Sequence, residues 1–113
     1  ALHVLLKHPN RRCVLMSEVD VAVLLPPRFQ LTLPPDTRVS LFPLGPVHVS
    51  SEGLKWPTEG IDFSPSETIG TSNIASGGRI DLLTSAPSMF LILPLPEISC
   101  VLEALLLSPK WPE

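Results

Sequence analysis

One short stretch of the chain gathers residues whose side chains suit a small planar ligand. Between residues 52 and 73 lie one of the two tryptophans, three of the six glycines and the run Thr71-Ser72-Asn73. An indole offers a flat, electron-rich face on which a cationic or heteroaromatic ring can stack. Hydroxyl and amide groups supply the donors and acceptors that would fix the orientation of such a ring. The stretch therefore predicts a ligand site, with Trp56, Thr71, Ser72 and Asn73 as its candidate residues.

Each candidate also has a purely structural interpretation. Trp56 could be an aromatic residue of the core or its rim. Ser72 and Asn73 could be turn residues, because asparagine tolerates the left-handed backbone region. Thr71 is the weakest candidate, since its side chain is expected on the opposite face of the strand from Ser72. Lys55 is best explained as a solvated charge, because it would repel a cationic ligand, and contact with a phosphate tail is the one ligand role that suits it.

Short segments of alternating apolar and polar residues predict the scaffold. Turn signals separate them every eight to ten residues, which is typical of antiparallel sheet with one buried and one solvated face. No long helical pattern lies between them to form a parallel crossover. The predicted strands lie at 19–23, 29–33, 38–42, 47–50, 68–73, 79–84 and 89–93, and the last is apolar throughout and expected at the centre of a sheet. The sequence therefore predicts an all-β fold, an antiparallel, jelly-roll-like β-sandwich.

A loop, a hairpin and two helices complete this prediction. Residues 57–66 are rich in turn formers and are predicted to form a loop. Residues 76–78, Ser-Gly-Gly, are predicted to form a hairpin turn between the strands on either side, because glycine accepts positive φ. Leucines at helical spacing in residues 1–8 predict a short N-terminal helix, the remnant of a longer element. Apolar residues at helical spacing in residues 98–106 predict a short amphipathic C-terminal helix.

The composition limits the classes of protein to which the chain can belong. Its 113 residues, 44% hydrophobic and 17% charged, suit one globular domain with a modest core. A net charge of −3 without a large basic cluster argues against nucleic-acid binding. The apolar runs are too short to span a membrane, and the histidines and cysteines lack the spacing of a metal site. Cys13 and Cys100 each lie in an apolar run and are predicted to be buried free thiols of a cytoplasmic protein.

The residues around Trp56 also carry a family resemblance. The run Ser51-Glu52-Gly53-Leu54-Lys55-Trp56-Pro57 is followed, after a gap, by Gly70-Thr71-Ser72-Asn73. This order and spacing resemble the C-terminal thiamin-binding domain of the thiamin pyrophosphokinase family, in which a Gly-Leu-Lys-aromatic turn precedes a Ser-Asn pair. Residues 38–45 are similar to the strand before that turn, and residues 15–18 to the strand that links the two domains of the family. The likeness covers roughly residues 1 to 93.

The resemblance implies a role for each candidate residue. In this family the aromatic residue of the turn lies against bound thiamin, which assigns Trp56 to the thiazolium and aminopyrimidine rings of the vitamin. Ser72 and Asn73, and more weakly Thr71, would form hydrogen bonds to the aminopyrimidine. No catalytic residue and no metal ligand is expected in this chain, because it has no paired acidic motif and no phosphate-binding loop.

The resemblance further implies a larger enzyme, which transfers pyrophosphate from ATP to the hydroxyethyl oxygen of thiamin to give thiamin diphosphate and AMP. In the family a preceding α/β domain binds ATP and Mg²⁺, and the thiamin site forms between subunits of a homodimer. Residues 1–12 would then be the tail of a preceding helix or linker from the nucleotide-binding domain, and 13–93 the thiamin-binding sandwich. Residues 94–113 would be a C-terminal extension that departs from the family pattern. The chain alone is expected to be inactive.

Two other interpretations stay open. The chain could be a non-enzymatic β-sandwich that serves as a binding or oligomerisation module, with a sheet edge or the C-terminal helix as its contact surface. It could also be a degenerate fragment that no longer folds, because loss of an upstream domain would expose apolar surface. Quenching of tryptophan fluorescence on addition of thiamin would argue against the first alternative. A cooperative thermal unfolding transition would argue against the second.

Overall fold

The computed structural model describes residues 2–66 and 70–113, and of residues 70–72 it describes the backbone only. The strands are β1 (Leu15–Met16), β2 (Asp20–Leu24), β3 (Arg28–Leu33), β4 (Arg38–Pro43), β5 (Val49–Glu52), β6 (Gly70–Ile74), β7 (Gly78–Thr84) and β8 (Met89–Pro94). The helices are α1 (Leu2–Lys7), the short 3₁₀ helix η1 (Leu95–Glu97) and α2 (Ile98–Leu107). The prediction of an all-β protein with a helix at each end is confirmed.

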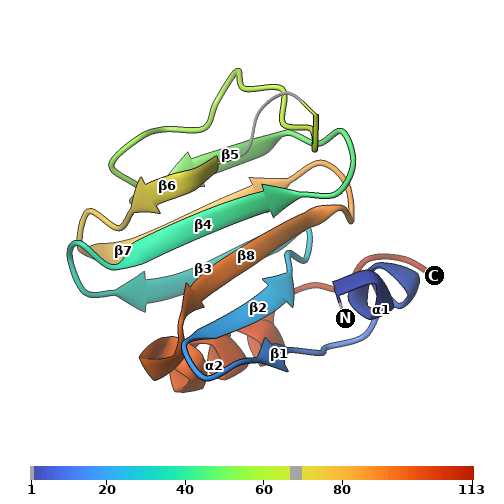
Figure 1. Ribbon diagram of the computed structural model, residues 1–113, viewed down its shortest axis with the longest axis horizontal. Coiled ribbons are helices and arrows are strands. Elements are labelled where there is room, and N and C mark those ends of the chain that lie inside the picture. Colours follow the sequence, from blue (N-terminus) through green and yellow to red (C-terminus); the bar gives the residue numbers. More distant parts are fainter. Residues whose placement is uncertain (1, 67–69) are drawn as a thin grey trace.

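The strands form two antiparallel sheets that face each other as a sandwich (Figure 1). The five-stranded sheet has the order β1-β2-β8-β4-β6, and the three-stranded sheet has the order β3-β7-β5. The apolar strand β8 pairs with β2 on one side and β4 on the other, so its predicted central position is confirmed. Strand β6 lies at an edge of its sheet, next to β4 alone.

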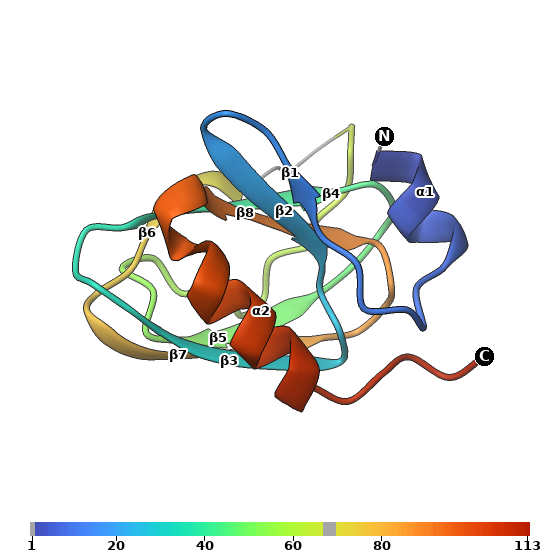
Figure 2. The same cartoon turned by 90° about the horizontal axis from the view of Figure 1, so that it is seen from below.

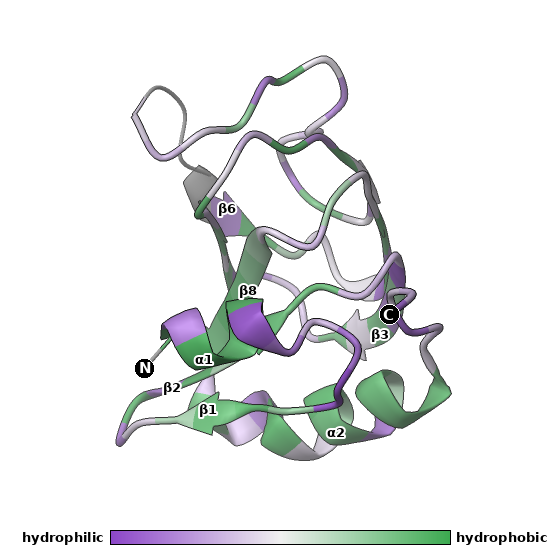
Figure 3. Ribbon diagram, turned by 90° about the vertical axis from the view of Figure 1, so that its right-hand side faces the viewer, coloured by the Kyte–Doolittle hydropathy of each residue, from purple (hydrophilic) through white to green (hydrophobic). Residues whose placement is uncertain are grey.

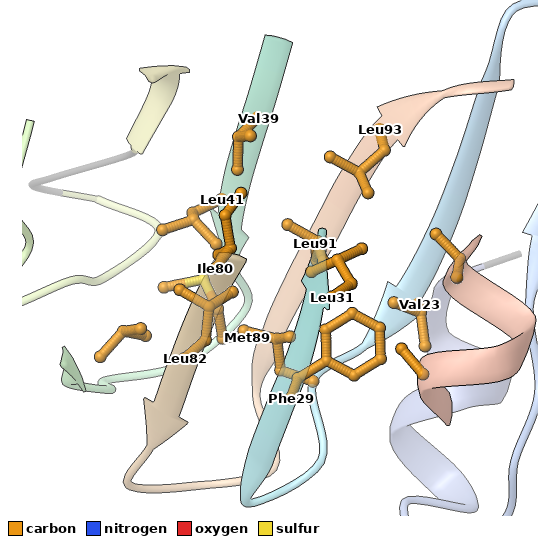
Figure 4. Packing of buried hydrophobic residues seen from close by; sticks show 14 of the residues in the cluster. Val23, Phe29, Leu31, Val39, Leu41, Ile80, Leu82, Met89, Leu91 and Leu93 are labelled. Atoms are coloured by element: carbon orange, nitrogen blue, oxygen red, sulfur yellow. The ribbon is translucent and has the colours of Figure 1, made fainter. Parts of the chain in front are cut away.

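The alternating pattern of the strands builds the core between the sheets. On β3, Phe29 and Leu33 are almost fully buried, whereas the intervening Thr32 is exposed. Ile80 and Leu82 of β7 point toward residues of the five-stranded sheet (Figure 4). Apolar burial of this kind is the main favourable contribution to folding, about 1.5–3 kcal/mol for each large side chain.

The chain crosses from one sheet to the other after β6, and the hairpin predicted at residues 76–78 is therefore wrong. Strand β6 pairs with β4 of the five-stranded sheet, whereas β7 pairs with β3 and β5 of the three-stranded sheet. The crossing runs beside the one between β3 and β4, because Ala75 N–H donates to the carbonyl of Thr37 at 2.8 Å. Gly77 has φ of +101°, and a Cβ there would lie 3.1 Å from Cβ of Pro35. Positive φ at Gly77 and Gly78 lets the chain make this crossing.

The C-terminal helix α2 packs against β3 beneath the sandwich (Figure 2). Its buried face consists of Val101, Ala104 and Leu105, and Figure 3 colours most of its ribbon as hydrophobic. Arg12 binds its last turn, with Nε 2.9 Å from the carbonyl oxygen of Leu105. Such contacts satisfy carbonyl groups that a helix end leaves without partners. Within the described residues, no helix combines the length and apolarity needed to cross a membrane.

The two cysteines differ from the prediction in their exposure. Both are free thiols, but Cys13 is exposed, because it precedes β1 in a segment at the protein surface. The expectation that both are buried is wrong for Cys13. Cys100 is half-buried on α2, where its thiol donates to the carbonyl of Thr32 at 3.3 Å, and burial raises the pKa of this thiol.

Candidate functional site

A turn between β5 and β6 presents the predicted tryptophan, and we call residues 53–58 the tryptophan turn. It begins at Gly53, whose φ is +90°. A Cβ at this position would lie 2.3 Å from the carbonyl oxygen of Arg79, so any other residue would displace the turn. The carbonyl of Gly53 also accepts a hydrogen bond from Ser76 N–H at 2.8 Å. The glycine of the Gly-Leu-Lys-Trp run is therefore required for the close approach of the turn to β7.

The first half of the turn continues the five-stranded sheet beyond its edge strand. Leu54 forms an isolated antiparallel bridge with Ala75, and both residues are buried. Lys55 N–H donates to the carbonyl of Ile74 at 2.9 Å. The backbone just before Trp56 is thus held like a short extra strand beside the end of β6.

Asn73 fixes the peptide groups of Trp56 itself. Its side-chain amide is 8% exposed and donates from Nδ2 to the carbonyl of Trp56 at 2.8 Å. Its Oδ1 accepts from the N–H groups of Trp56, at 3.2 Å, and of Ile74, at 3.0 Å. The two bonds to Trp56 reproduce the pairing of an antiparallel strand. Asn73 is therefore engaged with the backbone of the turn through both ends of its amide.

The end of the turn is bound to the other sheet. The hydroxyl of Thr58 donates to the carbonyl of Val49 on β5 at 2.6 Å, and Thr58 is only 2% exposed. Thr58 N–H donates to Oγ of Ser51 at 3.1 Å, while Ser51 N–H donates to Oε1 of Glu59 at 2.6 Å. Further along the same loop, the side chain of Asp62 forms a hydrogen bond with that of His48, which lies just before β5. The tryptophan turn thus bridges the two sheets at one end of the sandwich.

The indole of Trp56 lies outside the core. Trp56 is 52% exposed, whereas the aromatic residues of the core are buried. The following Pro57 restricts the backbone of Trp56 to extended conformations. Lys55 Nζ lies 5.0 Å from the centroid of the Trp56 ring, so a cation already rests over one face of the indole. Trp56 is therefore not a core residue, and its exposure is compatible with either a ligand-facing or a rim position.

The structure brings two of the four predicted site residues together and describes only part of the other two. Trp56 and Asn73 are joined by two hydrogen bonds. Thr71 and Ser72 lie on β6, the strand that carries Asn73, and their side chains are outside the described part of the structure, as are residues 68 and 69 of the predicted strand. Thr58 was missed, because an isolated threonine in a loop gives no sequence signal of its distant partner on β5.

The hollows whose lining the described residues form do not include Trp56. Hollows of about 240 and 250 Å³ lie beside α2, and Trp56 lines neither of them. A hollow of about 90 Å³ lies next to Glu59, between β5 and β7, and it does not include the indole either.

Three solved structures share this fold. A thiamine pyrophosphokinase from Bacillus subtilis aligns with a TM-score of 0.70 at 16% identity, over 82% of this chain and 47% of that one. A thiamin pyrophosphokinase from Geobacillus thermodenitrificans aligns with a TM-score of 0.68 at 19% identity, over 88% of this chain and 47% of that one. A thiamin pyrophosphokinase from Candida albicans aligns with a TM-score of 0.63 at 17% identity, over 72% of this chain and 32% of that one. The fold is thus the β-domain fold found in these enzymes, and the chain spans half of their length or less.

The family follows from the sequence of the sandwich. Residues 28–88, more than half of the chain, match the family model of the thiamin pyrophosphokinase vitamin B1-binding domain. The chain belongs to this family, which confirms the resemblance inferred from the Gly-Leu-Lys-Trp and Ser-Asn motifs. The matched range includes the tryptophan turn and β6. No curated protein matches the chain.

Proposed function

We propose that this chain binds thiamin by stacking one of its rings on the indole of Trp56. The observation that carries the proposal is the geometry of the turn in a member of the vitamin B1-binding family: the backbone of Trp56 is fixed by Asn73, while its side chain is half exposed. A rigid aromatic residue on an open surface loses little conformational freedom when a ligand stacks on it.

The chemistry of thiamin suits this surface. Its thiazolium ring carries a permanent positive charge, and its aminopyrimidine is a planar heteroaromatic ring. A cation over a tryptophan face gains about 0.5–1 kcal/mol at an exposed site and about 2 kcal/mol when water is excluded. Lys55 already uses this attraction. The attraction of a cation to a tryptophan face therefore supports thiamin as the ligand of Trp56.

Ser72, and more weakly Thr71, are proposed as the residues that hydrogen-bond the aminopyrimidine. They lie on β6, the edge strand to which the tryptophan turn is attached. Asn73 is proposed to contribute in a different way, because both ends of its amide are already bonded to backbone groups. Its second Nδ2 hydrogen is the part that can still reach a ligand.

We further propose that the chain acts within a thiamin pyrophosphokinase, which transfers pyrophosphate from ATP to thiamin. The exposure of Trp56 supports a second covering surface, and the family suggests the nucleotide-binding domain of a partner subunit in a homodimer. In the described residues, no three acidic, histidine or cysteine side chains gather into a site for the Mg²⁺ that such a transfer uses. ATP and Mg²⁺ are therefore proposed for the other domain, with residues 13–93 as the thiamin-binding part.

A fluorescence titration of the 113-residue chain tests thiamin binding. Trp111→Phe leaves Trp56 as the single tryptophan, and thiamin is expected to quench its emission along a saturable curve. Trp111 is a suitable residue to replace, because its indole donates to the carbonyl of Leu25, after β2, and not to the turn. Linear quenching equal to that of free tryptophan would contradict the proposal.

Two controls make the titration specific. Trp56→Phe leaves Trp111 as the only reporter, and its emission is expected to show no saturable change. The aminopyrimidine fragment of thiamin, which lacks the thiazolium cation, is expected to bind Trp111→Phe more weakly than thiamin. Equal affinity for the fragment would place the thiazolium away from the indole.

A further inference from the structure

A buried hydroxyl links the tryptophan turn to the sheet that does not carry the predicted site residues. Thr58 is 2% exposed, and its Oγ1 donates to the carbonyl of Val49 at 2.6 Å. Its backbone N–H donates to Oγ of Ser51 at 3.1 Å. Both partners belong to β5 of the three-stranded sheet, whereas Asn73 belongs to β6 of the five-stranded sheet. The turn is thus attached to one sheet on each side of Trp56.

These two attachments are only a few bonds apart along the chain. Asn73 holds both peptide groups of Trp56, and Thr58 is held two residues later. Pro57, which lies between them, has a fixed φ of its own and restricts the residue before it. The segment from Trp56 to Thr58 therefore has few backbone conformations that satisfy both sheets at once.

We propose that Thr58 is a positioning residue for the thiamin site, acting through Trp56. Its hydroxyl fixes the end of the turn on β5, so that the exposed indole faces the ligand in a single orientation. This inference rests on the proposed binding of thiamin at Trp56. It adds a residue of the tryptophan turn that is bonded to the three-stranded sheet, does not belong to the predicted site and acts without contacting the ligand.

Exposure of the indole is the reason that the attachment matters. Trp56 is 52% exposed, so packing against neighbours fixes only part of its side chain. A turn released from β5 would sample several positions, and thiamin would have to select one of them, which lowers the apparent affinity by the fraction of competent turns. The hydroxyl of Thr58 removes that loss before the ligand binds.

The test compares Thr58→Val with Thr58→Ser in the Trp111→Phe background. Valine has nearly the shape of threonine and cannot donate the hydrogen bond, whereas serine retains the donor. Thr58→Val is expected to raise the Kd for thiamin about 5- to 15-fold, and Thr58→Ser is expected to stay within about 2-fold of the parent. Time-resolved anisotropy of Trp56 without thiamin is expected to show faster local motion in Thr58→Val alone.

Ser108→Ala is the matched control for lost stability. Ser108 is buried on the far side of the fold, at the end of α2, where its hydroxyl donates to the carbonyl of Ala104 at 2.7 Å. Its replacement removes a similar buried bond and is expected to lower the melting temperature without changing the Kd or the anisotropy. Ser51→Ala removes the acceptor of Thr58 N–H and serves if Thr58→Val does not fold, with an expected rise in Kd of about 2- to 5-fold.

The outcomes separate this inference from the proposed function. Unchanged anisotropy and an unchanged Kd in Thr58→Val would overturn the positioning role while leaving thiamin binding intact. A parent chain that does not bind thiamin would overturn the proposed function. In that case the anisotropy still decides whether Thr58 orders Trp56, and equal motion in the parent and Thr58→Val would overturn that step as well.

Discussion

Replacement of Asn73 by alanine should destabilise the protein and weaken thiamin binding together. The side chain is almost fully buried and makes three hydrogen bonds, two to Trp56 and one to Ile74. Each such bond contributes about 0.5–1.5 kcal/mol. Because Trp56 is half exposed, water can replace part of what is lost, and we expect a loss of about 2–3 kcal/mol in the free energy of unfolding. Release of the Trp56 backbone costs about 1–2 kcal/mol when the ligand orders it again, which raises the Kd for thiamin about tenfold.

Urea unfolding followed by circular dichroism measures the first effect, and the Trp111→Phe titration measures the second. Asn10→Ala is the matched control, since the Asn10 side chain bonds the exposed side-chain carboxylate of Glu113, and its loss is expected to stay within about 0.5 kcal/mol. A cost for Asn73→Ala of less than about 0.5 kcal/mol would refute the reasoning, because the three bonds would then be replaceable by water.

Asn73→Asp distinguishes the donor of the amide from its acceptor. The introduced carboxylate can still accept from Trp56 N–H but sets a second oxygen against the Trp56 carbonyl, where Nδ2 now donates at 2.8 Å. The pKa of that carboxyl would be raised, because only its protonated form can donate to the carbonyl. The stability deficit is therefore expected at neutral pH and should shrink as pH falls through the raised pKa. A deficit that grows at acidic pH, relative to the parent, would show that the donor is unimportant.

Two further predictions concern charged residues. Lys55→Met should tighten thiamin binding about 2- to 5-fold, because it removes a cation that lies 5.0 Å from the Trp56 ring and competes for its face; an unchanged Kd in the Trp111→Phe titration would mean that the ligand uses the other face. Asp81→Asn should lower the melting temperature at pH 7, because a hydrogen bond from Arg28, at 2.8 Å, and another from Gln30 hold the pKa of Asp81 below its usual value. That stabilisation is present above the unfolded pKa of about 3.9 and is lost as pH falls through the lower folded pKa, so the two melting curves should converge in acid and not at neutral pH.

Most of the fold could be predicted from alternation alone. Strands such as β3 and β8 could be predicted because one side of each strand, or both, must be apolar in a sandwich. The connection after β6 could not be predicted, since Ser76-Gly77-Gly78 is compatible with either a hairpin or a crossing between sheets. The crossing is determined by the hydrogen bond between Ala75 and the backbone of Thr37, a residue that is distant in sequence.

The candidate site shows the same limit. Trp56 and Asn73 were identified because their residue types and family motif suit a planar ligand. The bonds between them join residues 17 positions apart and involve backbone groups, which no side-chain pattern encodes. Thr58 carries even less signal, although its burial and its bond to Val49 place it among the residues that fix the turn. Sequence reasoning thus finds side chains suited to a ligand more readily than those that hold them in place.

Nuclear Overhauser effects between thiamin and the single tryptophan of the Trp111→Phe chain test the central claim most directly. We predict effects from the thiazolium and aminopyrimidine protons to the indole protons of Trp56, together with upfield shifts of the thiamin resonances caused by the ring current. Nuclear Overhauser effects from thiamin to residues that line the hollows beside α2, with the Trp56 resonances unchanged at saturating thiamin, would contradict it. The vitamin would then bind elsewhere, and the tryptophan turn would not be its site.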